Sequence, residues 1–188
     1  MKPFLRIDDN LTIHLARPEL AEPVFNIVDE QRRYLRQWLP WVDATKTVED
    51  TKIFIRESMQ HNSKGTRLIT FILSGEEVAG ALSVVSFNKD HKKCEIGYWL
   101  REDMQGLGIM TKACATLIDY LFRTKNIHRM EITVAAGNEK SREVSLRLGF
   151  KSEGIHREAY FMYNVFYDVE MFALLKSEWA QSRQSFKF

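Results

Sequence analysis

Residues 105–111 read Gln-Gly-Leu-Gly-Ile-Met-Thr and lie between an apolar run at 94–100 and an amphipathic segment at 111–123. The two glycines let the backbone turn tightly and bring its N–H groups close to an anion. A helix that begins here adds unpaired N–H groups and the positive end of its dipole. This stretch predicts a strand, a turn and a helix that together bind the phosphate groups of a ligand.

Two common phosphate-binding motifs are excluded by the same residues. A dinucleotide fingerprint needs a third glycine in register, and a nucleotide P-loop needs a lysine directly before Ser or Thr. Here Met110 stands before Thr111, and no third glycine follows in register.

Hydrophobic periodicity outlines the rest of the chain. The patterns favour an α/β (α+β mixed) fold: a mixed, mostly antiparallel sheet of about seven strands with helices on both faces. Thr47 is a plausible N-cap, with Asp50 at the position that completes a capping box. We expect strands over 11–15, 68–73, 78–87, 94–100 and 130–135 and on both sides of Asn164, and helices over 18–37, 47–60, 111–123 and 139–148.

Composition limits the class of protein. The 188 residues suit one domain, 1–188, that needs no metal or disulfide for its core, and the net charge of +2 predicts no nucleic-acid surface. The N-terminus resembles no targeting signal and no apolar run reaches membrane length. Cys94 and Cys114 lack a paired spacing, which favours reduced thiols in a cytoplasmic protein. The five histidines form no metal motif, so we expect no metal.

Three further segments accompany the glycine turn: EIGYWL at 95–100, NEKS at 138–141 and LGF at 148–150. With them, the chain resembles the GCN5-related N-acetyltransferase (GNAT) superfamily, and within it the bacterial ribosomal-protein-serine/alanine N-terminal acetyltransferases. The matched segments run from Trp38 to Trp179, which is nearly the whole chain. The family's pyrophosphate loop reads Gln/Arg-x-x-Gly-x-Gly/Ala. Met110 departs from it at the last position, where a helical backbone N–H is all that is needed.

The resemblance implies acetyl-CoA as co-substrate. It places the pyrophosphate over 105–111 and the pantetheine along the strand that ends at Leu100. Thr111 is either a phosphate ligand or a plain helix-start residue. Asn138 is expected both to contact the cofactor and to cap a helix. The implied cofactor contacts are Trp99, Leu100, Gln105, Gly106, Leu107, Gly108, Ile109, Met110, Thr111 and Asn138.

Two residues are candidates for catalysis. The resemblance places Ser141 near the thioester sulfur, where its hydroxyl can assist the departing thiolate; the alternative is a solvated helix serine. Strand alternation puts Glu95, Gly97 and Trp99 on the face away from the core, so Glu95 is either a general base or a surface carboxylate. We expect direct transfer, with backbone N–H groups near Trp99–Leu100 stabilising the oxyanion.

The acceptor is the less determined half of the reaction. Trp38, Trp41 and Tyr160 are candidates for its site, although core packing is the commoner role of such residues. The pKa of an α-amine is about 7.7–8.0 and that of a lysine side chain about 10.4, so an α-amine needs less help from a base. This favours a protein N-terminus, as in the ribosomal-protein enzymes that the chain resembles.

Two alternatives remain open, together with the oligomeric state. The acceptor could instead be a small amine, such as a polyamine, an amino acid analogue or an aminoglycoside. The chain could also be a non-catalytic acyl-CoA-binding sensor. The apolar C-terminal strands could pair between two copies in a homodimer.

Overall fold

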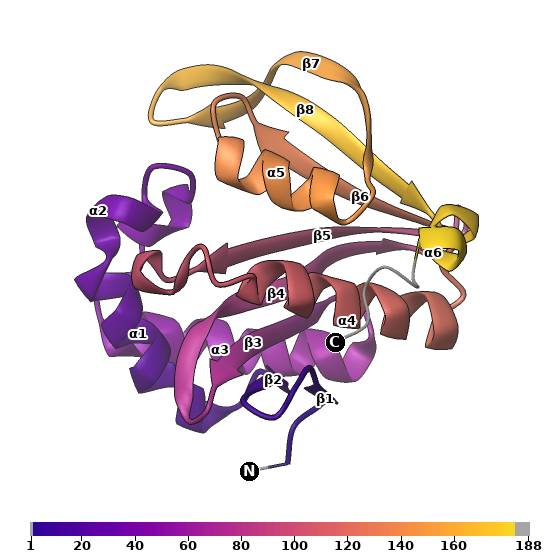
Figure 1. Cartoon of the computed structure of the whole chain (residues 1–188). Helices are drawn as coiled ribbons and strands as arrows, with labels where there is room; N and C mark the ends of the chain where they lie inside the picture. The colour runs from indigo at the N-terminus through magenta and orange to yellow at the C-terminus, as the bar shows by residue number, and fades with distance from the viewer. Residues whose placement is uncertain (1, 183–188) are drawn as a thin grey trace.

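A computed structural model of the chain describes residues 2–182 (Figure 1). Three short 3₁₀ turns, at Pro18–Leu20, Pro40–Asp43 and Glu102–Met104, join some of the larger elements. Those elements are, in chain order, β1 (Leu5–Arg6), β2 (Leu11–Leu15), α1 (Ala21–Glu30), α2 (Arg32–Leu35), α3 (Val48–Lys64), β3 (Leu68–Ser74), β4 (Glu77–Asn88), β5 (Lys93–Leu100), α4 (Ile109–Thr124), β6 (Arg129–Ala135), α5 (Glu139–Arg147), β7 (Lys151–Met162), β8 (Val165–Leu175) and α6 (Lys176–Ser182).

The strands of residues 2–182 form one eight-stranded sheet in the order β1-β2-β3-β4-β5-β6-β8-β7. Every neighbouring pair is antiparallel except β5 and β6, which are parallel. The prediction of a mixed, mostly antiparallel sheet is confirmed. The strand beyond the expected seven is the two-residue β1, which is too short to leave a periodic pattern.

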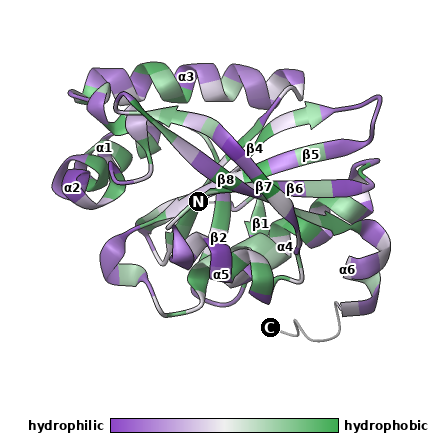
Figure 2. Ribbon diagram, turned by 90° about the horizontal axis from the view of Figure 1, so that it is seen from above, coloured by the Kyte–Doolittle hydropathy of each residue, from purple (hydrophilic) through white to green (hydrophobic). Residues whose placement is uncertain are grey.

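Helices cover both faces of the sheet, as predicted. The alternation of side chains in β3 divides the core: Phe71 and Leu73 pack with α1 and α3, whereas Ile72 faces the side of α4 and α5. Figure 2 shows α3 along one side of the sheet and α4 and α5 along the other. The two cores fix the helices relative to the strands that they cover.

Most predicted elements agree with the structure, and tertiary contacts explain the largest difference. The helix expected over 18–37 is a 3₁₀ turn followed by α1 and α2, with a break at Gln31. Here the Gln31 side chain binds the backbone N–H of Glu102 and the carboxylate of Asp103, 71 and 72 residues away in sequence. Thr47 and Asp50 form the expected capping box at the start of α3.

The parallel pair β5–β6 is short, and the two strands then separate. Their ladder joins Lys93, Cys94 and Glu95 to residues 129–131 and goes no further. Ion pairs of Glu131 with Lys93 (3.1 Å) and Arg129 (2.8 Å) stabilise this paired end of the two strands. Figure 1 shows β6 turning away from β5 towards the β7–β8 hairpin. Residues 96–100 of β5 therefore have a strand partner, β4, on one side only.

One edge of the sheet is β1 and the other is β7, a strand whose residues are mostly exposed. Its pairing in a homodimer remains a prediction.

Gly80 allows β4 to approach the end of β5 closely. A Cβ at this position would lie 2.2 Å from the carbonyl oxygen of Trp99 and 2.9 Å from the Cα of Leu100. Both contacts are to backbone, which cannot move aside as a flexible side chain does. Glycine at position 80 therefore sets the position of the Trp99–Leu100 peptide.

We predict that Gly80→Ala lowers the free energy of unfolding by about 1–3 kcal/mol, the usual cost of overpacking a buried site. Urea denaturation measures the change. Gly97→Ala is the matched control on the neighbouring strand, because its Cβ would meet only Val85 Cγ1 at 3.4 Å. Equal losses in the two variants would contradict the explanation.

Candidate active site

The gap between β5 and β6 opens into a cleft of about 620 Å³. Its walls come from the C-terminal end of β5, the turn at 105–108, the first turn of α4, one face of α5 along its length, and residues between 34 and 39 in and after α2. A volume of this size is typical of a pocket for a small ligand or cofactor. Elements far apart in the chain therefore meet around one concave site.

The glycine turn forms the end of this cleft beside α4. Gly106 and Gly108 have φ values of +75° and +72°, a left-handed conformation in which side chains other than glycine are strained. Gly108 is the N-cap of α4, and it has no side chain that could accept hydrogen bonds from the first N–H groups of the helix. The start of α4 therefore combines uncapped donors with the positive end of the helix dipole, as the sequence predicted.

Met110 keeps the helical conformation that this turn requires. It lies in α4, and its side chain is buried among the core residues beneath the cleft. Leu107 differs from the other residues of 105–111, because it does not line the cleft and its side chain is 67% exposed. Nothing in the spacing of the motif separates Leu107 from its neighbours.

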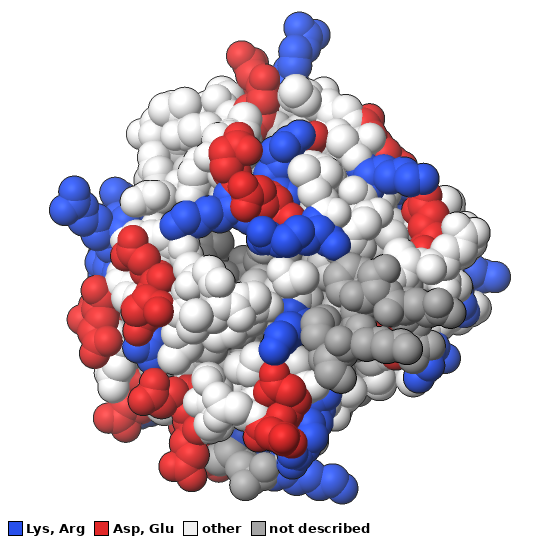
Figure 3. Space-filling model, in the orientation of Figure 1, with Lys and Arg blue, Asp and Glu red and all other residues white. Residues whose placement is uncertain are grey.

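Three cationic residues line the cleft: Lys112, Lys140 and Arg147. Each has a polar contact: Lys112 with Asp8 (3.2 Å), Lys140 with the Gln105 side-chain oxygen (2.6 Å) and Arg147 with Glu143 (3.4 Å). Figure 3 shows Lys and Arg side chains beside a hollow near the middle of this face, with acidic side chains next to them. The cleft thus offers positive charge without a large basic surface.

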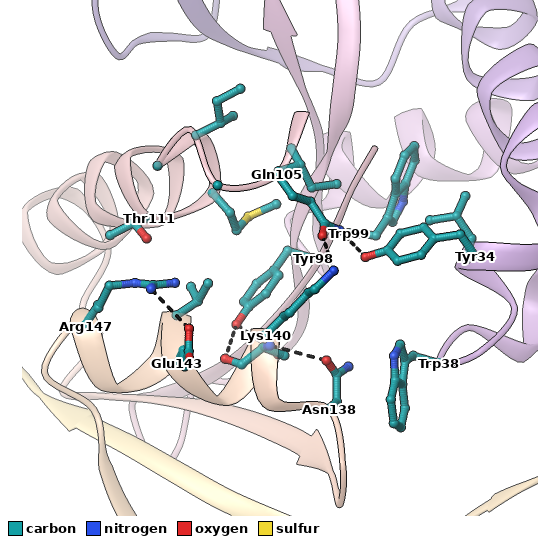
Figure 4. A pocket seen from close by; sticks show the side chains of 18 of the residues that line it. Tyr34, Trp38, Tyr98, Trp99, Gln105, Thr111, Asn138, Lys140, Glu143 and Arg147 are labelled. Atoms are coloured by element: carbon teal, nitrogen blue, oxygen red, sulfur yellow. Dashed lines mark hydrogen bonds and ion pairs between the residues drawn. The ribbon is translucent and has the colours of Figure 1, made fainter. Parts of the chain in front are cut away.

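A chain of polar contacts crosses the cleft (Figure 4). The amide nitrogen of Gln105 donates a hydrogen bond to the Tyr34 hydroxyl, and its oxygen accepts one from Lys140. The Lys140 ammonium also lies 5.7 Å from the centre of the Tyr34 ring. Gln105 therefore connects α2 to α5 across the opening, a link that the sequence motif alone does not reveal.

Asn138 and Ser141 stand together at the start of α5. Asn138 caps the helix by accepting the backbone N–H of Ser141 at 3.3 Å, as predicted. The hydroxyl of Ser141 lies 3.1 Å from the Tyr98 hydroxyl. Tyr98 is half-buried, and burial raises its pKa well above the usual range of a phenol. All three residues line the cleft.

Glu95, unlike the other catalytic candidate Ser141, does not line the cleft. It belongs to the last residue pair of the short β5–β6 ladder. It lies four positions before Trp99 in the strand, a distance of roughly 13 Å at the usual rise. Alternation indicates which face of a strand a residue occupies, but not how far along the strand the cleft begins.

The three aromatic candidates for the acceptor site lie near one another, but only Trp38 lines the cleft. Tyr160 does not line the cleft. Its hydroxyl donates a hydrogen bond to the Trp38 carbonyl oxygen at a distance of 3.4 Å. Trp41 is 40% exposed, and its ring lies 6.4 Å from that of Trp99. The β7–β8 hairpin and the segment after α2 therefore meet beside this end of the cleft.

Sequence reasoning missed several residues of the cleft. The alternation that puts Glu95, Gly97 and Trp99 on one face of the strand predicts Tyr98 on the core face, and its ring does pack against the core. Its hydroxyl nevertheless reaches the cleft. Lys140 lies in the same segment as Asn138 and Ser141, so its place in the sequence could have predicted that it lines the cleft. Tyr34, Leu35, Leu39, Lys112, Glu143, Val144 and Arg147 also line the cleft.

Within residues 2–182 no cluster of three or more His, Cys, Asp or Glu side chains is arranged to hold a metal ion. No helix in the same range is both long and apolar enough to cross a membrane.

Both cysteines are buried free thiols. Burial raises the pKa of Cys94 to about 12 and that of Cys114 further, so both remain protonated at neutral pH. A pKa of about 12 leaves roughly one thiolate in 10⁴ at pH 8. We predict that a disulfide reagent such as DTNB labels neither thiol in native protein at pH 8 and labels both in urea. Rapid labelling of the native protein would contradict this account.

Known proteins with similar sequences and structures identify the family. A family model described as an acetyltransferase (GNAT) domain matches residues 10–151. The ribosomal-protein-serine acetyltransferase of Escherichia coli (strain K12) is 27% identical over 173 residues, which cover 92% of this chain and 97% of that protein.

Two solved structures are also similar. One is the Microcin C7 self-immunity acetyltransferase MccE in complex with acetyl-CoA and AMP (TM-score 0.88, 28% identity, 90% of this chain and 94% of that one). The other is RimL, a ribosomal L7/L12 α-N-protein acetyltransferase, in complex with coenzyme A (TM-score 0.88, 26% identity, 91% and 97%). The fold is that of an acyl-transferring enzyme. The chain belongs to the GNAT family of acetyltransferases.

Proposed function

We propose that this chain transfers the acetyl group of acetyl-CoA directly to the N-terminal α-amine of a ribosomal protein. The observation that carries the proposal is the meeting, in one cleft, of the uncapped start of α4 and the free side of β5. The first suits a phosphate group, and the second suits an amide-containing arm.

The phosphate end of the cofactor fits the residues around α4. N–H groups from the turn at 106–108 and from Ile109 to Thr111 would hold the pyrophosphate, and Lys112, Lys140 and Arg147 would supply counter-charge. The Gln105 side chain, which now bonds Tyr34 and Lys140, is the polar group nearest to this turn in sequence.

The reactive end of the cofactor fits the open side of β5. Backbone groups within 96–100 that are directed away from β4 have no strand partner, so they would pair with the amides of the pantetheine arm. Acetyl-CoA supplies an activated acyl group. Backbone N–H groups near Trp99 and Leu100 would stabilise the negative charge that develops on its carbonyl oxygen, and Ser141 would hydrogen-bond the departing sulfur.

The acceptor end of the cleft favours an α-amine over a polyamine. Trp38, Leu39 and Trp99 give this end an apolar and aromatic character. Glu143 is the one carboxylate among the described residues that line the cleft, and it is paired with Arg147. A polyamine with several charges would find no acidic partners there, whereas a peptide N-terminus carries one charge that it loses before attack.

The first test measures CoA release from acetyl-CoA with peptides that copy ribosomal-protein N-termini beginning with Ser or Ala. The comparison set contains the same peptides with a blocked α-amine and an internal lysine, together with spermidine and an aminoglycoside. We expect turnover on the free α-amine peptides alone. Turnover confined to the small amines would overturn the proposed acceptor but keep the acetyltransferase.

A non-catalytic sensor is the remaining alternative, and one variant distinguishes it. A sensor would bind acetyl-CoA tightly without turnover on any acceptor, and Ser141→Ala would change nothing. The proposed enzyme loses about 10²-fold in kcat with Ser141→Ala, the lower end of the usual contribution of an acid catalyst. Its acetyl-CoA affinity stays within about twofold, because the backbone supplies most of the proposed cofactor contacts.

In contrast to Ser141→Ala, a substitution of Glu95 is expected to leave activity nearly unchanged. Because Glu95 lies outside the cleft wall, we expect Glu95→Gln to keep kcat/KM within about threefold on an α-amine peptide. The measurement is the pH profile of kcat/KM for both proteins between pH 6 and 9. A loss of 10²-fold or more, together with the loss of a titrating group, would restore Glu95 as a base acting through water.

A further inference from the structure

The Tyr98 hydroxyl approaches Ser141 from below the start of α5. It lies 3.1 Å from the Ser141 hydroxyl oxygen and 3.1 Å from the Ser141 carbonyl oxygen. A phenol has a single proton to donate, and the Ser145 hydroxyl also lies within its hydrogen-bonding reach, so the two Ser141 oxygens and the Ser145 oxygen compete for that proton. The oxygen that receives the Tyr98 proton determines the direction in which the Ser141 hydroxyl can point its own proton.

The carbonyl oxygen of Ser141 already has donors. The hydroxyl of Ser145 donates to it at 3.2 Å, and in an α-helix the N–H four residues on donates to the same oxygen. A carbonyl has two lone pairs, so the phenol proton would be a third donor there. The hydroxyl oxygen of Ser141 has no partner except Tyr98 among residues 2–182. The balance of donors and acceptors therefore favours the Ser141 hydroxyl oxygen over the Ser141 carbonyl oxygen as the acceptor of the Tyr98 proton.

We propose that Tyr98 is a positioning residue for Ser141: its phenol donates to the Ser141 hydroxyl oxygen and leaves the serine proton free to point into the cleft. This inference rests on the proposed function, in which that proton meets the departing sulfur. Tyr98 acts through the serine and keeps its own proton throughout.

The surroundings keep this arrangement in place. The ring of Tyr98 packs against the core beneath α4, and burial holds its hydroxyl protonated across the working pH range. The backbone N–H of Ser141 is fixed by Asn138. Ser141 is thus held at its backbone nitrogen, its carbonyl oxygen and its hydroxyl oxygen. The remaining freedom of its hydroxyl group is rotation of the O–H bond, which Tyr98 restricts. A donated hydrogen bond also polarises the serine O–H and makes it a better donor.

The chemistry balances without a further reactant. The nitrogen–carbon bond forms as the carbon–sulfur bond breaks, and the bonding electron pair leaves with the sulfur. The serine hydroxyl donates a hydrogen bond to that sulfur, which stabilises the charge while the new amide loses its extra proton to solvent. Tyr98 supplies orientation, so its removal should affect the chemical step rather than cofactor binding.

The test compares Tyr98→Phe, Ser141→Ala and the double variant in the full-length protein with acetyl-CoA and an α-amine peptide. We expect Tyr98→Phe to lower kcat about tenfold, with KM for acetyl-CoA within about twofold, the effect of one lost hydrogen bond in the chemical step. The double variant should be no slower than Ser141→Ala, because Tyr98 has no effect once the serine hydroxyl is gone.

Tyr120→Phe is the matched control. It removes a phenol hydroxyl from a half-buried tyrosine of α4 that does not line the cleft and whose ring meets Phe4 edge to face at 5.0 Å. We expect it to leave kcat unchanged. Thermal unfolding of each variant detects a loss of folding that would lower activity for another reason.

The outcomes separate this inference from the function on which it rests. If Ser141→Ala is slow and Tyr98→Phe is as fast as the parent, the role of Tyr98 is wrong and the proposed function stands. If the double variant is slower than Ser141→Ala by the full factor of Tyr98→Phe, the tyrosine acts through packing and the inference also fails. If the parent protein turns over no acceptor, the proposed function itself has failed.

Discussion

The short ladder between β5 and β6 is the constraint on which the rest of the site depends. Three residue pairs hold the two strands together, and ion pairs from Lys93 and Arg129 to Glu131 strengthen that end. Beyond Glu95 the strands separate, and the open side of β5 becomes a wall of the cleft. A longer ladder would satisfy that side with β6 and would close the site before a substrate could enter.

The local parts of this site could be predicted from sequence because they follow from local rules. The glycine turn, the start of α4 and the cap at Asn138 depend on residues within a few positions of one another, and the structure has each as expected. The element pattern also predicted the other strands and helices, but it missed the two-residue β1, the C-terminal helix α6 and the break at Gln31, whose side chain binds the segment after β5.

The parts that could not be predicted depend on distant residues. Tyr98 looked like core because alternation cannot tell an apolar ring from the hydroxyl at its tip, and that hydroxyl meets a residue 43 positions later. Glu95 looked free to line a cleft because the point where β5 leaves β6 is set by their register, not by either strand alone. Tyr160 meets Trp38 across 122 positions, so the end of the cleft that we propose for the acceptor emerges only from the fold.

Amide hydrogen exchange with and without CoA reports on the backbone groups that we propose hold the cofactor. We expect slower exchange on CoA addition for amides within 96–100 and 106–111, with little change in the edge strand β7. Protection confined to other segments, or no protection at saturating CoA, would contradict a cofactor cleft formed by the separation of β5 and β6.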